Sequence, residues 1–405
     1  MTLRSRWLFT ILWLVCLEPF GALAQIDPVR RDLLQFGYNA ALEGHPPLSL
    51  YAFYYRNQPN FIQTNLTLRL AVAPTYMDSE LGISHVGTEH TDLGIDLAGG
   101  GFADSYQEIE RGQFVQSQSF IGHSVEGGLS VYHLFNPGQL IPLYAVVRGE
   151  AHYSFYERDD ETASNFKLPP DHTTFNVRSG LRWGGREPTL FPDLAMELSI
   201  WYRGEFRTDS GTYGFNDREL KSQSHLFWAE AALAYTLPTL KHSFFVSLTA
   251  GTSIEADRFS AYRLGALLPL AAEFPLSLPG YYNQELSAER FLLLGSDYIL
   301  PLDKNQRWNI AATASTAWVD YLDDLSQPGH WNTGVGGGLL YKTDSFKMML
   351  CYAYGVDAIR SHGRGADSIG VLMQLDLEKA HAKMFNPVPP SMWQGLQRVF
   401  GVFGD

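Results

Sequence analysis

The sequence is poor in cysteine, in positive charge and in long apolar runs, and each shortage narrows the class of protein. Only two cysteines occur, Cys16 and Cys351, so a disulfide-rich scaffold is excluded. The formal net charge of -13 argues against nucleic acid as a partner, because phosphate backbones attract basic proteins. No apolar run after residue 24 approaches the roughly 20 residues of a membrane helix. Aromatic residues, in contrast, make up 14% of the chain.

The N-terminus has the features of a secretory signal peptide. Two arginines precede an apolar stretch at residues 7–16, and residues 22–24 (Ala-Leu-Ala) supply a small-residue cleavage site. We expect cleavage after Ala24, which would remove Cys16 and leave Cys351 without an intrachain partner. An exported chain that is rich in aromatics and has no helical span is predicted to be a soluble β-protein or an outer-membrane barrel.

Long segments alternate between apolar and polar residues. In residues 195–207, Leu198, Ile200 and Phe206 fall on one face and charged side chains on the other, which predicts a strand between two different environments. Residues 174–183 and 143–155 repeat the pattern. We predict that the charged face lines a barrel lumen, with these lumen-lining residues: Arg148, Glu150, Arg178, Arg182, Glu197, Arg203 and Glu205. A soluble sandwich or propeller would have shorter strands and an inner face poor in charge.

The strand pattern predicts an all-β fold, a transmembrane antiparallel β-barrel of about 16 strands with an inward-folded loop. Beyond the three segments above, strands are expected at 48–56, 61–73, 90–98, 122–135, 224–236, 242–254, 287–300, 307–319, 331–342, 346–356 and 367–378, with two less regular ones at 76–86 and 112–121. The connections alternate in length, with short turns such as 301–307 and 341–345 and long polar loops at 157–172, 208–223 and 357–366. That alternation is typical of outer-membrane barrels.

The chain is divided into four parts on this basis: a signal peptide at 1–24, a short periplasmic segment at 25–46, the barrel at 47–379 and a periplasmic tail at 380–405. Residues 29–44 are compatible with one short helix. Within the tail, a Pro-rich linker precedes residues 392–400, whose apolar side chains could share one helix face. Two interpretations of this tail stay open, an anchor or plug and a frayed end.

Residues 260–270 (SAYRLGALLPL) join two predicted strands but are largely apolar, with one charge at Arg263. A loop inside a barrel lumen is partly shielded from water, so its apolar side chains can pack on the wall. A guanidinium suits such a place, because its planar fork binds a carboxylate bidentately. We therefore expect the loop to fold inward and Arg263 to pair with a lumen carboxylate.

Residues 262–302 resemble the BamA/TamA superfamily of outer-membrane assembly and translocation barrels, and in particular the barrels fused to patatin-like domains. Arg263-Leu264-Gly265 matches the family's lumen-loop motif, and the strand end DYILPL at 297–302 matches a family ending, with Asp297 at its acidic position. Five predicted strands follow the loop, as in the family. The resemblance implies that Arg263 and Gly265 hold the loop in the lumen, that Asp297 receives the arginine and that Glu289 stands behind it.

The sequence also departs from the family. Ala266 stands where a second glycine is common, and Ile299 replaces an arginine. The following strand lacks the family's Asp-x-Gly, since Asp320 comes too late in it. No segment resembles the family's periplasmic repeat domains or a patatin domain.

Catalytic and cofactor motifs are weak. Ser124 with His123 or His152 is the strongest candidate for an outer-membrane esterase, but the stretch lacks Gly-x-Ser-x-Gly spacing. The histidines show no metal-ligand spacing, so we predict no enzyme, no cofactor and no metal. The glycines of residues 332–340 (NTGVGGGLL) predict a strand that a loop or partner approaches closely.

The sequence thus favours a bacterial outer-membrane barrel that inserts or translocates a client protein or lipid. Its expected partners are outer-membrane lipid, that client and a periplasmic protein that supplies the missing domains. The alternative is a passive porin-like channel for small polar solutes.

Overall fold

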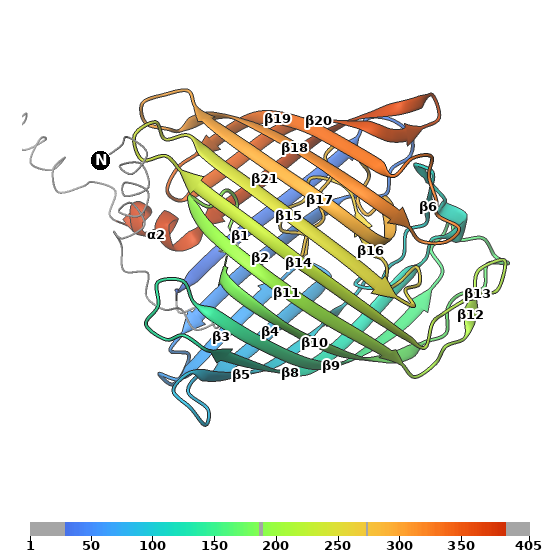
Figure 1. The fold of residues 1–405 in the computed structure, drawn as a ribbon, viewed down its shortest axis with the longest axis horizontal. Helices are drawn as coiled ribbons and strands as arrows, with labels where there is room; N and C mark the ends of the chain where they lie inside the picture. Colours follow the sequence, from blue (N-terminus) through green and yellow to red (C-terminus); the bar gives the residue numbers. More distant parts are fainter. Residues whose placement is uncertain (1–28, 186–188, 273, 386–405) are drawn as a thin grey trace, which may run out of the picture.

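The computed structural model describes residues 29–185, 189–272 and 274–385; the predicted signal peptide and residues 386–405 of the predicted tail lie outside these ranges. One antiparallel sheet of 17 strands dominates the structure. Sixteen strands close into the barrel wall, and β16 (Tyr262–Leu264) lies inside it, paired with β17. Neighbours along the chain are neighbours in the wall, so the barrel has up-and-down topology (Figure 1).

The wall strands are β1 (Arg31–Ala41), β2 (Leu50–Pro59), β3 (Leu66–Val72), β4 (Tyr76–Ile83), β5 (Thr91–Gly100), β8 (Ile121–Leu134), β9 (Leu143–Glu157), β10 (His172–Gly185), β11 (Leu194–Arg207), β14 (Gln223–Thr236), β15 (Ser243–Ile254), β17 (Leu286–Pro301), β18 (Trp308–Tyr321), β19 (Trp331–Lys342), β20 (Phe346–Arg360) and β21 (Gly363–Asp376). The short helix α2 (Leu377–Phe385) follows β21. The barrel closes where β1 pairs with β21, from Leu33 opposite Asp376 to Ala41 opposite Ser368.

Two sequence predictions about strands were wrong, and they offset each other. The expected helix at 29–44 is strand β1, so the barrel begins at Arg31 instead of residue 47. The expected strand at 112–121 is not part of the wall. That segment belongs to an external loop with the small hairpin β6 (Ile109–Glu110) and β7 (Gln113–Phe114) and the 3-10 turn Gln116–Gln118. The count of sixteen is therefore right although one strand was placed wrongly.

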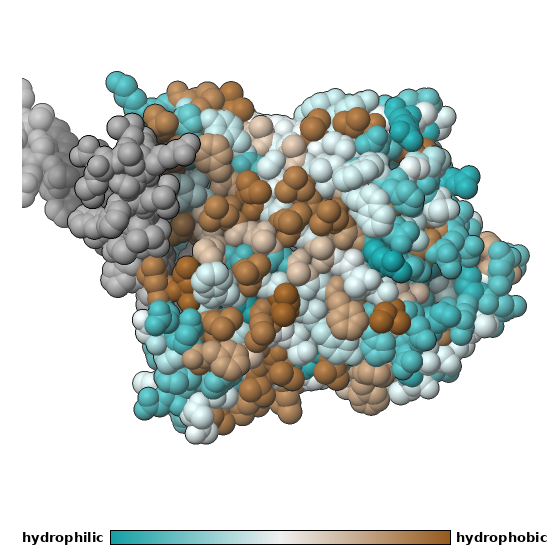
Figure 2. Space-filling model, viewed as in Figure 1, coloured by the Kyte–Doolittle hydropathy of each residue, from teal (hydrophilic) through white to brown (hydrophobic). Residues whose placement is uncertain are grey.

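The two faces of the wall differ as the alternation predicts. Large apolar side chains point outward along most strands, among them Leu198 and Ile200 on β11 and Val177 and Leu181 on β10. Figure 2 shows hydrophobic residues (brown) spread over the middle of one face of the barrel, and hydrophilic residues (teal) gathered at the end that carries the long loops. An apolar belt around a closed barrel matches the hydrocarbon layer of a membrane. Among the described residues, no helix is both long and apolar enough to cross a membrane.

The two ends of the barrel also differ. Short turns and α2 occupy one end, which we call the short-turn end. The hairpins β6/β7 and β12 (Thr212–Tyr213)/β13 (Arg218–Glu219) project from the other, the long-loop end. One predicted long loop, 357–366, is instead a tight hairpin, because β20 continues to Arg360, which pairs with Gly363.

Candidate functional site

The segment between β15 and β17, residues 255–285, enters the lumen from the long-loop end. Its entry is fixed by backbone pairing, since Tyr262, Arg263 and Leu264 form β16 against the first residues of β17. Gly265 then lies between two stretches of the same segment, and a side chain there would collide with the backbone of Tyr282 and Gln284. The expected inward-folded loop is therefore present, and we call residues 262–285 the lumen loop.

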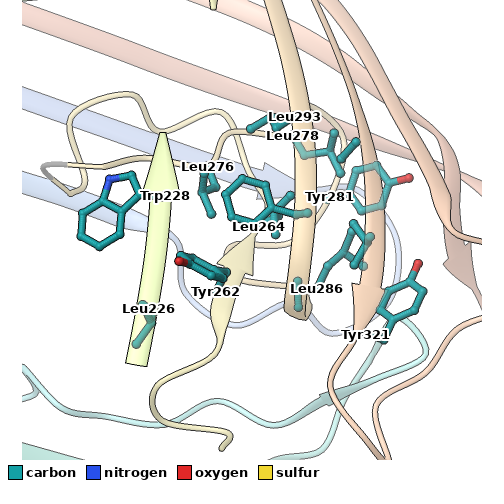
Figure 3. Packing of buried hydrophobic residues seen from close by; sticks show 14 of the residues in the cluster. Leu226, Trp228, Tyr262, Leu264, Leu276, Leu278, Tyr281, Leu286, Leu293 and Tyr321 are labelled. Carbon is teal, nitrogen blue, oxygen red and sulfur yellow. The ribbon is translucent and has the colours of Figure 1, made fainter. Parts of the chain in front are cut away.

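An apolar core forms where the lumen loop meets the wall. Leu264, Leu278 and Tyr281 of the loop are fully buried and share one cluster with wall residues of β14, β17 and β18. Figure 3 shows Tyr262 and Leu264 on β16 lying between Leu226 and Trp228 on one side and Leu286 and Tyr321 on the other. Burial of several large side chains, each worth about 1.5–3 kcal/mol, holds the loop against the wall.

The wall under the loop is built from small residues. The lumen faces of β18 and β19 carry Ala317, Ser315 and Gly334, among others. A side chain at Gly334 would meet the backbone of Pro279, and one at Gly280 would meet the backbone of Gly355 on β20. The prediction that the glycines of residues 332–340 admit a close approach is confirmed at Gly334, and the approaching segment is the lumen loop.

A buried ion pair anchors the end of the lumen loop. Arg360 on β20 donates from Nη1 to Glu285 Oε1 at 2.8 Å and from Nη2 to Glu285 Oε2 at 3.0 Å. The two side chains are 1% and 0% exposed. The guanidinium also lies 3.7 Å from the centre of the Tyr282 ring, and the backbone N–H of Tyr282 donates to Glu285 Oε2 at 2.7 Å. A pair this deeply buried is costly to break, because either partner alone would leave an uncompensated charge.

The predicted partnership of Arg263 with Asp297 is wrong. Arg263 donates from Nη2 to the backbone carbonyls of Gln107 and Gln284 at 2.8 and 2.9 Å, and its guanidinium lies 5.0 Å from the centre of the Tyr106 ring. The reason is the distance between the two residues along β17. Arg263 is opposite Ser287 on β17, and Asp297 is ten residues further along that strand, about 33 Å away.

The structure places the two predicted acidic residues in different surroundings. Asp297 faces the lumen deep in the barrel, at a small cavity that Leu270 of the lumen loop also lines. Glu289 lies at the long-loop end, beside a register shift in the pairing of β17 with β18. Of the four residues proposed for the loop lock, Arg263 and Gly265 contact other parts of the loop segment, while the carboxylate lock is made by Glu285.

A second cluster of charges caps the lumen loop at the long-loop end. Glu108, in the loop between β5 and β8, is fully buried and pairs with Arg258. It also accepts a hydrogen bond from the Tyr106 hydroxyl at 2.6 Å and lies 3.4 Å from Arg218 Nη2. Burial acts to raise the pKa of Glu108, but Arg258, Tyr106 and Arg218 together lower it below its ordinary value. Three external loops thus converge on one carboxylate above the lumen loop.

The short-turn end is crossed by residues 189–193, which directly precede β11. Leu190 of this segment is buried among Leu268 of the lumen loop and wall residues of β20 and β21. Its backbone N–H donates to Gln374 Oε1 on β21 at 2.8 Å, and Lys347 Nζ donates to its carbonyl. Since β10 and β11 stand halfway round the wall from β21, residues 189–193 bridge the mouth; we call them the bridging turn. A cavity of about 100 Å³ lies between it and the lumen loop.

The lumen wall formed by β9, β10 and β11, next to β14, carries many charges. The structure places all seven predicted lumen-lining residues on the inner face of β9, β10 and β11. Most form ion pairs with neighbours, as Arg148 does with Glu80 and Glu150, Arg182 with Glu197, and Arg203 with Glu205. The guanidinium of Arg178 lies 4.4 Å from the centre of the Trp201 ring. The apolar core of the lumen loop reaches this wall at Val146 and Trp201, and charged side chains line the rest of it.

The candidate nucleophile Ser124 lies on the lumen face of β8, and His152 on the lumen face of β9. Both ring nitrogens of His152 face carboxylates, Nδ1 towards Glu126 at 2.8 Å and Nε2 towards Asp104 at 2.7 Å. His123 is on the outer face of β8, stacked on Phe155. Neither histidine is placed to take a proton from Ser124, so the structure does not assemble the arrangement that an esterase would need.

Sequence reasoning missed Glu285, Arg360, Glu108, Arg258 and Leu190. Arg360 fell in a segment predicted to be a loop, and Leu190 in a turn. One signal was present, because Glu285 directly precedes β17 within the apolar stretch that resembled the lumen-loop family. A carboxylate that becomes buried beside apolar segments requires a buried cation nearby.

Fold and site together define a class: a 16-strand transmembrane β-barrel whose lumen holds one of its own loops. Similar solved structures are CdiB from Escherichia coli (TM-score 0.57, 12% identity, 86% of this chain and 63% of that one) and CdiB from Acinetobacter baumannii (0.55, 13%, 85% and 60%). BamA from Haemophilus ducreyi lacking POTRA domains 1-3 is also similar (0.53, 11%, 85% and 70%). The chain spans less than two thirds of the CdiB chains. No protein-family model and no curated protein matches the sequence. At these identities the likeness establishes the fold.

Proposed function

We propose that this protein is a gated barrel of the bacterial outer membrane, related to the BamA/TamA superfamily, that inserts or translocates a client protein or lipid. The observation that carries the proposal is the lumen loop. It is held by an apolar core, by the buried Glu285–Arg360 pair and by a cap of external loops. A loop docked this firmly acts as a plug that a client or partner displaces. The fold shared with CdiB and BamA supports the same assignment, and no catalytic residue is part of it.

A passive channel for small polar solutes is the second candidate. It is favoured by the charged wall of β9–β11, where arginines and carboxylates line the lumen beside the loop core. In that case the lumen loop would only narrow a permanently open path.

Single-channel conductance in planar bilayers separates the two functions. A gated barrel gives a closed or briefly flickering trace for the wild type and a steady open state for Glu285→Gln, which leaves Arg360 without its counter-charge. Glu197→Gln, which removes a lumen carboxylate away from the loop, serves as the matched control and should stay closed. A steady open level in the wild type that Glu285→Gln does not change would support the porin and exclude the plug.

A further inference from the structure

Three carboxylates from three neighbouring strands meet on the charged side of the lumen. They are Asp96 on β5, Glu126 on β8 and Glu150 on β9, and one oxygen of each lies within 4.8 Å of the other two. Such like charges repel one another strongly at this distance unless a proton or a cation lies among them.

The backbone leaves room for this meeting at one residue. Gly128 on β8 pairs with Asp96 on one side and with Glu150 on the other. A side chain at Gly128 would come within 2.7 Å of both Asp96 Oδ2 and Glu150 Cγ. Because Gly128 has no side chain, the carboxylates of Asp96 and Glu150 can approach each other across the lumen face of β8. Glu126 lies on the same face of β8, two residues before Gly128.

The bases nearby do not satisfy the three acids. Glu126 accepts from His152, which also contacts Asp104, and Glu150 Oε1 lies 3.5 Å from Arg148, which also contacts Glu80. Arg203, whose charge also acts on Glu126 and Glu150, pairs with Glu205. Each of these three bases is thus shared with a further carboxylate outside the trio.

Asp96 provides the independent observation. Its side chain is 5% exposed, and within the described part of the chain neither carboxylate oxygen has a hydrogen-bond partner. A buried carboxylate with both oxygens unsatisfied is costly, so a ligand that satisfies them is expected there.

From this geometry we propose that Asp96, Glu126 and Glu150 bind a divalent cation of the hard class, Ca²⁺ in the first place. Oxygen ligands lie about 2.3–2.6 Å from Ca²⁺, so ligand oxygens on one ion are at most about 5 Å apart, which the trio meets. Carboxylate oxygens alone favour Ca²⁺, Mg²⁺ or Mn²⁺ over Zn²⁺ or Cu²⁺. His152 is not a ligand, because both its nitrogens face carboxylates. The ion would join β5, β8 and β9 on the lumen face of the wall.

The test compares Ca²⁺ binding and thermal unfolding of the full barrel in detergent micelles after chelator treatment, with NaCl at matched ionic strength. The wild type should bind one Ca²⁺ by titration calorimetry and unfold at a higher temperature with Ca²⁺. Asp96→Asn should lose affinity at least about tenfold, the effect of losing one charged ligand. Without Ca²⁺, Asp96→Asn should unfold at or above the wild-type temperature, because it relieves the repulsion among the three acids.

Two further variants keep the result interpretable. Gly128→Ala retains all three charges but fills the space between them, so it should also lose the Ca²⁺ response. Glu197→Gln, a lumen carboxylate on β11 outside the trio, should respond like the wild type. The proposal is overturned if Ca²⁺ binds the wild type no better than Na⁺ does, or if Asp96→Asn and Gly128→Ala respond as the wild type does. In the first case the trio holds a proton instead, and stability without Ca²⁺ should fall as the pH rises.

Discussion

At the scale of single residues, the lumen loop depends on charges that have no access to water. Glu285 and Arg360 satisfy each other bidentately, and Arg360 also covers the Tyr282 ring. A buried pair of this kind adds little stability over an apolar pair of the same shape, but removal of one partner costs about 3–5 kcal/mol. The pair therefore sets where the loop docks more than how tightly it does so. Cys351 reports on that docking, since it is buried on the wall beside Ala266 and Leu268.

We predict that Glu285→Gln exposes Cys351. The variant leaves Arg360 buried without a counter-charge, so the undocked population of the loop should rise and the rate of maleimide labelling with it, by at least about tenfold. Labelling is measured on folded barrel in which Cys16 is replaced by Ser. Glu289→Gln removes a half-buried carboxylate four residues further along the chain, on β17; it is the control and should label like the parent. Equal rates for the two variants would mean that the ion pair does not hold the loop.

At the scale of elements, alternation in the sequence located most wall strands, because a strand between lipid and lumen has two different faces along its whole length. Strand β1 also alternates, with Leu34, Phe36 and Tyr38 outward and Gln35, Gly37 and Asn39 inward, but its spacing also suits a short amphipathic helix. The segment at 112–121 alternates only irregularly and was placed in the wall to restore an even strand count, but its Phe120 packs on Tyr106 in the loop between β5 and β8. Pairings such as Glu285 with Arg360 could not be predicted, since they depend on which strands become neighbours after closure.

The bridging turn carries a prediction at this scale. Leu190→Ala should lower the free energy of unfolding by about 2–4 kcal/mol, because the residue is buried among the lumen loop and the wall. Denaturant unfolding of the barrel in detergent measures the change. Leu240→Ala in the turn between β14 and β15, where the side chain is 60% exposed, is the matched control and should change the value by under about 0.5 kcal/mol. Similar losses in both variants would show that the bridging turn does not pack as described.

At the scale of the whole molecule, the apolar belt predicts a dependence on membrane depth that a soluble barrel would lack. Ile200, near the middle of β11, and Leu194, at its first residue, both point outward. In lipid vesicles, Ile200→Arg should lower the free energy of unfolding by about 2–4 kcal/mol and Leu194→Arg by about 0–1 kcal/mol. Urea titrations of vesicle-reconstituted protein measure both values. An equal, small effect at the two positions would contradict a lipid-facing belt.

The internal strand β16 has a consequence for assembly. Strand β16 pairs with β17 inside the closed wall. The wall closes between its first and last strands, where Gln35 and Gln374, 339 positions apart in the chain, are hydrogen-bonded through their side chains. If the barrel closed first, the lumen loop would have to pass the external loops around Glu108 to reach the interior. If the sheet is still open, the loop can pack on it without obstruction. We therefore expect residues 262–285 to settle on β17 early and the β1–β21 contact, the one with the largest loop-closure entropy, to form last.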